Sequence, residues 1–140
     1  MRAAVAIAGL LLVLQAPATL ACGYCVEDKI AATYDHAVVV RALSHGHHVV
    51  FFHIDGALTA GEDTRRMLEA AAESTVGVDK GSVRVSVEAL TISFAFDPER
   101  TSLVKVQSAL ERKLAARKLS LMSLRVMDRP TELKTVSRKQ

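Results

Sequence analysis

Cysteine is nearly absent from this chain of 140 residues, since the only two, Cys22 and Cys25, lie in one Cys-x-x-Cys motif near its start. Small exported domains without a sufficient apolar core are usually rich in disulfides. The sequence after Cys25 offers no cysteine for such bonds, whereas half of all residues are hydrophobic. A disulfide scaffold is therefore excluded, and a hydrophobic core must hold the domain together.

Tryptophan is absent, and aromatic residues make up only 4% of the chain. Basic residues form no stripe with interleaved aromatics, so the sequence gives no support for nucleic-acid binding. The 18 basic residues include Arg2 in the leader, which leaves 17 basic and 15 acidic residues in the mature chain. Much of this small excess lies near the end, at Lys134, Arg138 and Lys139.

Residues 1–21 are expected to be a secretory signal peptide, because Arg2 is followed by an apolar run over residues 3–14 and then by small residues. That run of 12 residues is shorter than the ~18–20 needed to cross a bilayer. Cleavage after Ala18 or Ala21 would give a periplasmic or secreted protein without a transmembrane anchor.

A lipid anchor on Cys22, which would hold the protein at the cell envelope, is the alternative. Bacterial lipoproteins usually have Leu three residues before the lipidated cysteine, whereas Leu20 lies two residues before Cys22. Because this motif is one residue out of register, export without a lipid is the preferred prediction.

A helix is expected over residues 26–44, which contain neither Gly nor Pro. Glu27 and Asp28 in its first turn complement the helix dipole. Four residues at helical spacing would share its buried face: Ile30, Tyr34, Ala37 and Val38. Residues 22–47 are thus expected to form a CxxC segment and an N-terminal helix ahead of the main domain.

A buried strand is expected over residues 48–54, a short run rich in β-branched and aromatic residues. Thr59 and Glu62 fit a capping box for a helix that ends near residue 73. Two alternating apolar runs then predict a hairpin that turns at residues 88–89. Its expected pairs, all facing one core, are Val87 with Leu90, Val85 with Ile92 and Val83 with Phe94.

Thr101 or Ser102 is expected to cap the next helix, whose buried face would carry Leu103, Val106, Leu110 and Leu114. A last strand over residues 119–127 would place on one face Met122, Leu124 and Val126. Residues 129–140 lack a clear period and are expected to form a flexible tail. The predicted fold class is α+β: a ferredoxin-like βαββαβ sandwich over residues 48–128. The extra N-terminal helix would cover the open face of the sheet or pack at its edge.

Residues 48–128 resemble the heavy-metal-associated (HMA) domain family of small copper and zinc carriers. The resemblance rests on the strand order, on Gly56 just after the first strand, and on Phe-Ala-Phe-Asp-Pro at residues 94–98 before a capped helix. In that family, two cysteines of a Gly-Met-x-Cys-x-x-Cys loop after the first strand bind the metal. Aligning Gly56 places Thr59 and Glu62 at the cysteine positions, and their oxygens do not suit Cu(I). The resemblance therefore implies the fold without the family's metal ligands.

Two thiols at the spacing of Cys22 and Cys25 can form a disulfide, exchange disulfides, or bind a soft metal such as copper or zinc. Cys25 precedes a predicted helix, whose exposed N–H groups stabilise a thiolate, whereas Glu27 and Asp28 oppose further negative charge. A thioredoxin-type enzyme would need a strand before the motif, and none is predicted there. Metal binding, an inert disulfide or lipid-attachment site, and redox catalysis all stay open.

His45, His47 and His48 form a dense tract and are further candidate metal ligands. About 20 residues of helix would separate Cys25 from His45, which at ~1.5 Å per residue puts them roughly 30 Å apart. One site that combined both groups would need a broken helix or an antiparallel dimer, so two independent sites or none is expected. His53, on the first strand, is expected to be a paired core or edge residue.

The sequence contains no nucleophile elbow, phosphate loop or zinc-protease motif, so it identifies no catalytic residue. The preferred hypothesis is an exported, non-enzymatic small protein that binds copper or zinc through Cys22 and Cys25. One alternative is a structural or interaction module of the envelope with an unidentified protein partner and disulfide-bonded or lipidated cysteines. A thiol-disulfide oxidoreductase is the other.

Overall fold

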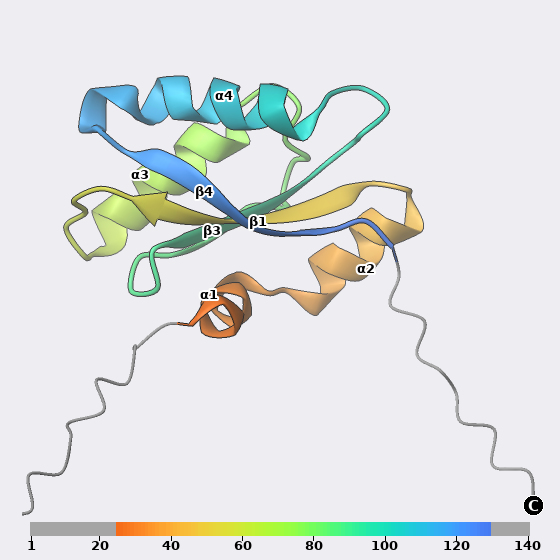
Figure 1. The fold of residues 1–140 in the computed structure, drawn as a ribbon, viewed down its shortest axis with the longest axis horizontal. Helices are drawn as coiled ribbons and strands as arrows, with labels where there is room; N and C mark the ends of the chain where they lie inside the picture. Colours follow the sequence, from red (N-terminus) through yellow and green to blue (C-terminus); the bar gives the residue numbers. More distant parts are fainter. Residues whose placement is uncertain (1–24, 130–140) are drawn as a thin grey trace, which may run out of the picture.

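The computed structural model describes residues 25–129, which form three layers (Figure 1). A four-stranded antiparallel sheet is the middle layer. One of its faces is covered by α3 (Glu62–Glu73) and α4 (Leu103–Leu114), and the other by α1 (Val26–Thr33) and α2 (His36–Ser44). A short 3-10 turn, η1 (Ala115–Arg117), follows α4.

Several sequence predictions lie outside the described residues. These are the signal peptide (1–21) with its cleavage sites, Cys22, and the tail beyond Arg129. Between residues 25 and 129, no helix is long and apolar enough to span a membrane.

The sheet has the strand order β2-β3-β1-β4. Its strands are β1 (His48–Asp55), β2 (Arg84–Ser86), β3 (Thr91–Phe96) and β4 (Ser120–Met127). Helix α3 connects β1 to β2, and α4 connects β3 to β4. This is the ferredoxin-like βαββαβ arrangement, so the predicted fold class is confirmed.

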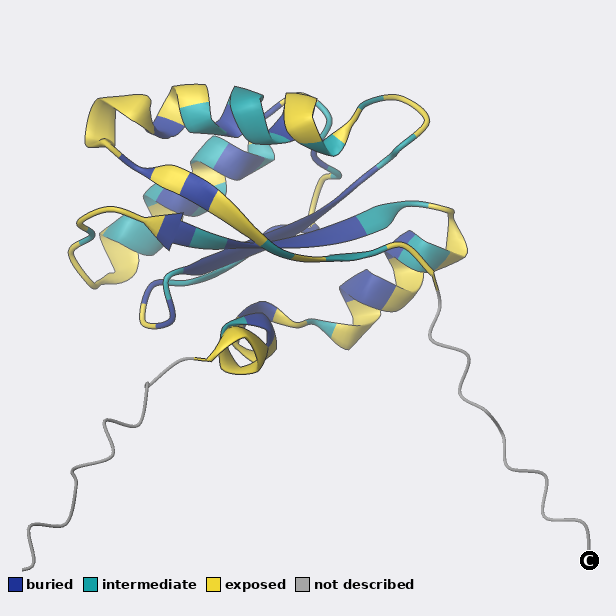
Figure 2. Ribbon diagram, viewed as in Figure 1, coloured by how far each residue is buried: buried dark blue, intermediate teal, exposed yellow. Residues whose placement is uncertain are grey.

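Strand β1 is one of the two inner strands, and it is apolar on both sides because helices cover both of its faces. Val50 and Phe52 belong to the larger core beneath α3 and α4, and Val49 and Phe51 belong to a smaller core beneath α1 and α2. Figure 2 shows the buried residues of all four helices turned toward the sheet. The smaller core comprises Ile30, Val39, Ala42, Val49, Phe51 and Ala95.

The N-terminal segment covers the second sheet face, as one of the two sequence alternatives expected, but the single helix predicted over residues 26–44 is wrong. It breaks after Thr33, and Asp35 caps α2 by accepting a hydrogen bond from the Val38 N–H at 3.2 Å. Arg84 of β2 donates to Asp35 at 2.9 Å. The Val38 N–H, and then Arg84, lower the pKa of this carboxyl. After the break, Tyr34 is exposed rather than on the buried face.

The predicted last strand exists, but its three apolar residues do not share one face. The pairing of β4 with β1 shifts between Phe51 and Phe52, where β4 contains one additional residue. Such a bulge reverses which face each following side chain occupies. Leu124 therefore packs with the smaller core, whereas Val126 packs with the larger one and Met122 is exposed.

The predicted hairpin is present with Val85 opposite Ile92. Its turn is longer than residues 88–89, because β2 ends at Ser86 and β3 begins at Thr91. Leu90 has a positive φ of 53° within this turn, and its carbonyl accepts a hydrogen bond from the Ile54 N–H at 2.7 Å. The turn is thereby tied to β1.

The two predicted helix caps had different outcomes. Ser102 caps α4 by accepting a hydrogen bond from the Lys105 N–H at 3.3 Å, which confirms the prediction. The predicted capping box of Thr59 and Glu62 is wrong, because α3 begins at Glu62 and its N-cap is Gly61. Glu62 instead accepts hydrogen bonds from Arg65 and Arg66 within the helix.

Gly56, which follows β1, is expected to tolerate no side chain. Its φ is +126°, and an added Cβ would lie 2.7 Å from Leu119 Cδ2 and 2.8 Å from the Lys118 carbonyl oxygen. We expect Gly56→Ala to lower the free energy of unfolding by about 1–3 kcal/mol, as measured by urea denaturation. Gly81→Ala is the control, because Gly81 also has a positive φ but nothing lies within 4 Å of an added Cβ. Equal losses for both variants would show that the contact with Leu119 and Lys118 does not matter.

Candidate functional site

Cys25 lies at the N-terminal end of α1 with its side chain exposed and its thiol free. Its carbonyl accepts the first helical hydrogen bond, from the Lys29 N–H at 3.0 Å, and its side chain does not cap the helix. The sulfur is therefore available to a ligand. The structure describes the Cys-x-x-Cys motif from this second cysteine onward, so the placement of Cys22 relative to Cys25 stays a prediction.

Helix α1, which carries Cys25, is fixed to the sheet. Ile30 is only 4% exposed and belongs to the smaller core. Lys29 donates to the Ala89 carbonyl at 2.9 Å and lies 3.1 Å from His53 Nδ1. Glu27 pairs with Arg125 of β4, with one Nη1–Oε2 distance of 3.1 Å. His53 Nδ1 also lies 3.1 Å from the Leu90 carbonyl oxygen, so this histidine is paired. These contacts together anchor the helix that carries the thiol.

The charge near Cys25 is partly compensated. Glu27 and Asp28 are the acidic residues in the first turn of α1, next to Cys25 in the sequence. The hydrogen bond from Arg125 lowers the pKa of Glu27, so that carboxylate is ionised and paired with a cation.

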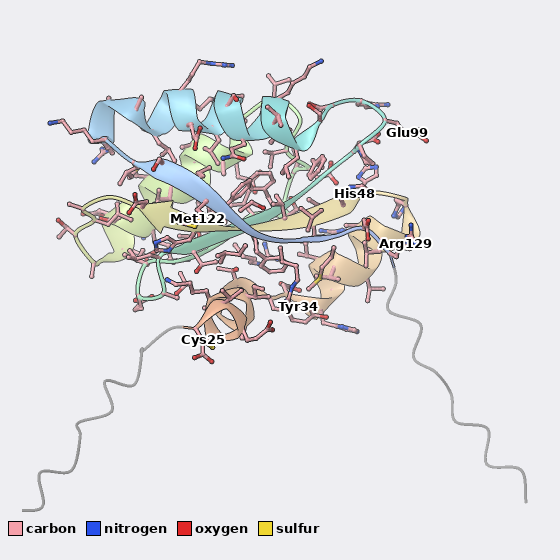
Figure 3. All side chains as sticks on the ribbon, viewed as in Figure 1. Cys25, Tyr34, His48, Glu99, Met122 and Arg129 are labelled. Carbon is pink, nitrogen blue, oxygen red and sulfur yellow. The ribbon has the colours of Figure 1, made fainter. Side chains whose placement is uncertain are left out.

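The histidine tract runs from the end of α2 into the start of β1, away from Cys25. Figure 3 shows Cys25 and His48 at opposite sides of the molecule. The break in the helix therefore does not bring Cys25 close to His45, which is the C-cap residue of α2. Between residues 25 and 129, no three His, Cys, Asp or Glu side chains converge as a ligand set for a metal ion.

Within the tract, each histidine has a different partner. His45 Nδ1 lies 2.7 Å from the Arg41 carbonyl oxygen of its own helix. His48 packs edge-on against Phe96, with ring centroids 5.6 Å apart. His47 Nδ1 lies 2.6 Å from Asp79 Oδ2. The centroids of the His47 and His45 rings are 6.4 Å apart.

The loop after β1 does not suit a soft metal. Thr59 is exposed there, and the oxygens of Glu62 interact with Arg65, which lowers the pKa of this carboxyl. Neither residue offers a thiolate or thioether, the donors that select Cu(I). Thr59 and Glu62 thus offer only oxygen donors at these positions, and the carboxylate of Glu62 is already paired with Arg65 and Arg66.

No protein-family profile matches the sequence, and no curated protein matches it. Among solved structures, the chain is similar to a copper-binding domain from HMA7, a P-type ATPase, with 18% identity and a TM-score of 0.45 over 56% of this chain and 96% of that one. The likeness is one of fold.

Two further solved structures have the same kind of likeness. One is the N-terminal domain of a potential copper-translocating P-type ATPase from Bacillus subtilis, in the Cu(I)-loaded state, with 17% identity and a TM-score of 0.45 over 59% of this chain and 92% of that one. The other is oxidised MerP from Ralstonia metallidurans CH34, with 21% identity and a TM-score of 0.43 over 55% and 96%. The ferredoxin-like fold rests on the chain's own strand order, and no binding residue carries over from these structures.

The sequence pattern did not point to Asp79 and Asp97 as partners of His47. They lie 32 and 50 residues after it, in a loop and at the end of a strand. No short spacing connects them, so only the folded sheet shows that they meet.

Proposed function

We propose that this chain is an exported, non-enzymatic protein that binds one soft metal ion, copper(I) or zinc, through Cys22 and Cys25. The observation that carries the proposal is the exposed, free thiol of Cys25 at the start of an anchored helix. Thiolates are the preferred ligands of Cu(I) and good ligands of Zn(II). The second thiol, three residues earlier in the sequence, would complete a chelating pair.

In this proposal the thiol pair that binds the metal lies apart from the position that the HMA resemblance implies. The loop after β1 has lost its thiols, and Cys25 instead lies on the opposite helical layer. The ferredoxin-like core then acts as a support for α1. The open side of Cys25 would allow a partner protein to reach the metal and accept it by ligand exchange.

The test is a Cu(I) titration of the reduced mature protein against a chromophoric chelator. We expect Cys22→Ser/Cys25→Ser to weaken binding by more than about 100-fold, since loss of an outer-shell partner alone costs 10–100-fold. His45→Gln, at the far end of the layer, is the matched control and should bind like the wild type. Equal affinities of the wild type and the double variant would refute the proposal.

Intact-mass analysis of protein from the cell envelope separates the alternatives. A mass two hydrogens below that of the reduced mature chain indicates a disulfide, and a diacylglycerol adduct indicates a lipidated Cys22. Either finding in all of the protein would argue against metal binding by these thiols. Insulin reduction that depends on Cys25 would point to an oxidoreductase instead.

A further inference from the structure

His47 lies between two aspartates that the fold brings to it from different elements. Its Nδ1 is 2.6 Å from Asp79 Oδ2, and its Nε2 is 3.7 Å from Asp97 Oδ2. Asp79 comes from the loop between α3 and β2, and Asp97 follows β3 directly. The cluster lies near the end of the sheet where Figure 3 labels His48 and Glu99, away from Cys25.

Backbone hydrogen bonds fix His47. The N–H of His47 bonds to the Ala42 carbonyl at 2.9 Å, and the N–H of Gly46 bonds to the Leu43 carbonyl at 3.1 Å. With Gly46 at a φ of 75°, this is a Schellman motif at the end of α2. The helix end therefore sets the direction in which the His47 ring leaves the chain.

Hydrogen bonds also fix the backbone of Asp79 and the carboxylate of Asp97. The N–H of Asp79 bonds to the Ala95 carbonyl of β3 at 2.9 Å, and its own carbonyl accepts the Ser82 hydroxyl at 2.6 Å. Asp97 Oδ1 accepts the Glu99 N–H at 2.9 Å, which leaves Oδ2 directed toward His47. His47 therefore already faces both carboxylates.

The contact with Asp79 places a proton on Nδ1 of the imidazole. At 2.6 Å, Nδ1–H donates to the Asp79 carboxylate. In the neutral ring, Nε2 then carries a lone pair that faces Asp97 Oδ2, which is also an acceptor. Two acceptors that face each other at 3.7 Å are stabilised by a cation between them, either a proton on Nε2 or a metal ion.

We propose that His47 Nε2 and the Asp97 carboxylate bind one borderline divalent cation of the Zn(II) or Cu(II) class, with Asp79 as the orienting partner. A metal-bound histidine almost always donates its other ring N–H to a carboxylate or carbonyl, as His47 does to Asp79. Ligand bonds of ~2.0–2.1 Å at a tetrahedral metal place two donor atoms roughly 3.3 Å apart, close to the 3.7 Å here. Imidazole and carboxylate suit these borderline ions better than Cu(I).

Water would complete the coordination, because no third metal-binding side chain joins this pair within residues 25–129. The pair opens into a groove of about 560 Å³ that Gly77 and Thr101 also line. Arg100 Nε lies 3.5 Å from Asp97 Oδ2, but its side chain is 87% exposed and can swing away. This site lies away from Cys25, and its nitrogen and oxygen donors, unlike the thiols, do not favour Cu(I).

The test uses the full mature chain with Cys22→Ser and Cys25→Ser, so that thiols do not contribute, and Zn(II) as the probe. Histidine-ring ¹⁵N NMR reports Nδ1 and Nε2 of each imidazole separately. We expect zinc to change the ¹⁵N chemical shift of His47 Nε2 more than that of any other histidine ring nitrogen. Calorimetry should show that His47→Gln or Asp97→Asn removes binding and that Asp79→Asn weakens it by about 10–100-fold.

His45→Gln is the control, because its ring is 6.4 Å from that of His47 and an unspecific histidine cluster would use both. Unchanged zinc affinity in this variant supports the proposal, and a loss as large as that of His47→Gln overturns it. No His47 shift at millimolar zinc overturns it as well. Should a substitution unfold the chain, the spectrum of the chain with His47 intact decides the question. Failure here would leave Cu(I) binding by the thiols unaffected.

Discussion

Phe51→Ala is expected to lower the free energy of unfolding by about 3–5 kcal/mol. Phe51 is 0% exposed and lies in the inner strand β1, beneath α1 and α2. It is the largest buried side chain of the smaller core. The next largest is Ile30, and the other buried members are Val and Ala residues. Truncation would therefore leave a cavity that few neighbouring side chains can fill. Urea denaturation followed by circular dichroism measures the loss.

Met122→Ala is the matched control for this prediction. Met122 pairs with His53 on the same face of the sheet, but its side chain is 56% exposed. Its truncation should change stability by less than about 0.5 kcal/mol. A loss below about 1 kcal/mol for Phe51→Ala would show that α1 and α2 do not pack on the sheet as described.

The elements of the main domain could be predicted because local patterns decide them. The strand at His48–Asp55 is a short apolar run, and α4 has a Ser cap and apolar residues at helical spacing. In both, burial in the fold agrees with the local preference. The order of these elements then leaves few topologies, of which the ferredoxin-like sandwich is one.

The errors fall where a distant contact decides the structure. The helix break at Asp35 is supported by Arg84, which lies 49 residues further along the chain. The bulge in β4 depends on how that strand fits the twisted neighbour β1, and no Gly or Pro marks it in the sequence. A good helical pattern over residues 26–44 could not show that one straight helix would fail to follow this sheet.

Of the two candidate sites, one is a local sequence motif and the other is formed by residues that are distant in the sequence. The motif of Cys22 and Cys25 is visible in the sequence because its two cysteines are separated by only two residues. The sequence also singled out His47, but only as one member of a tract. Its pairing with Asp79 and Asp97 depends on three separate chain segments meeting at one end of the sheet.

Deletion of the segment through Gly46, which leaves residues 47–140, is expected to abolish cooperative folding of the remaining domain. Without α1 and α2, one side of the sheet would expose Val49, Phe51 and Ala95, each at most 1% exposed in the full structure. A contiguous apolar sheet face in water favours self-association over a monomeric native state. The chain that begins at Cys25 retains both helices and is the control.

Size-exclusion chromatography and thermal unfolding of the two chains test this expectation. The shorter chain should elute as oligomers and show no sharp transition, and the longer one should be monomeric and cooperative. A monomeric, cooperatively unfolding shorter chain would contradict it and make α1 and α2 a separable addition. If the expectation holds, the helix that carries Cys25 is part of the core itself. Metal binding by the proposed thiol pair would then stabilise the whole domain, because α1 leaves the sheet only when the domain unfolds.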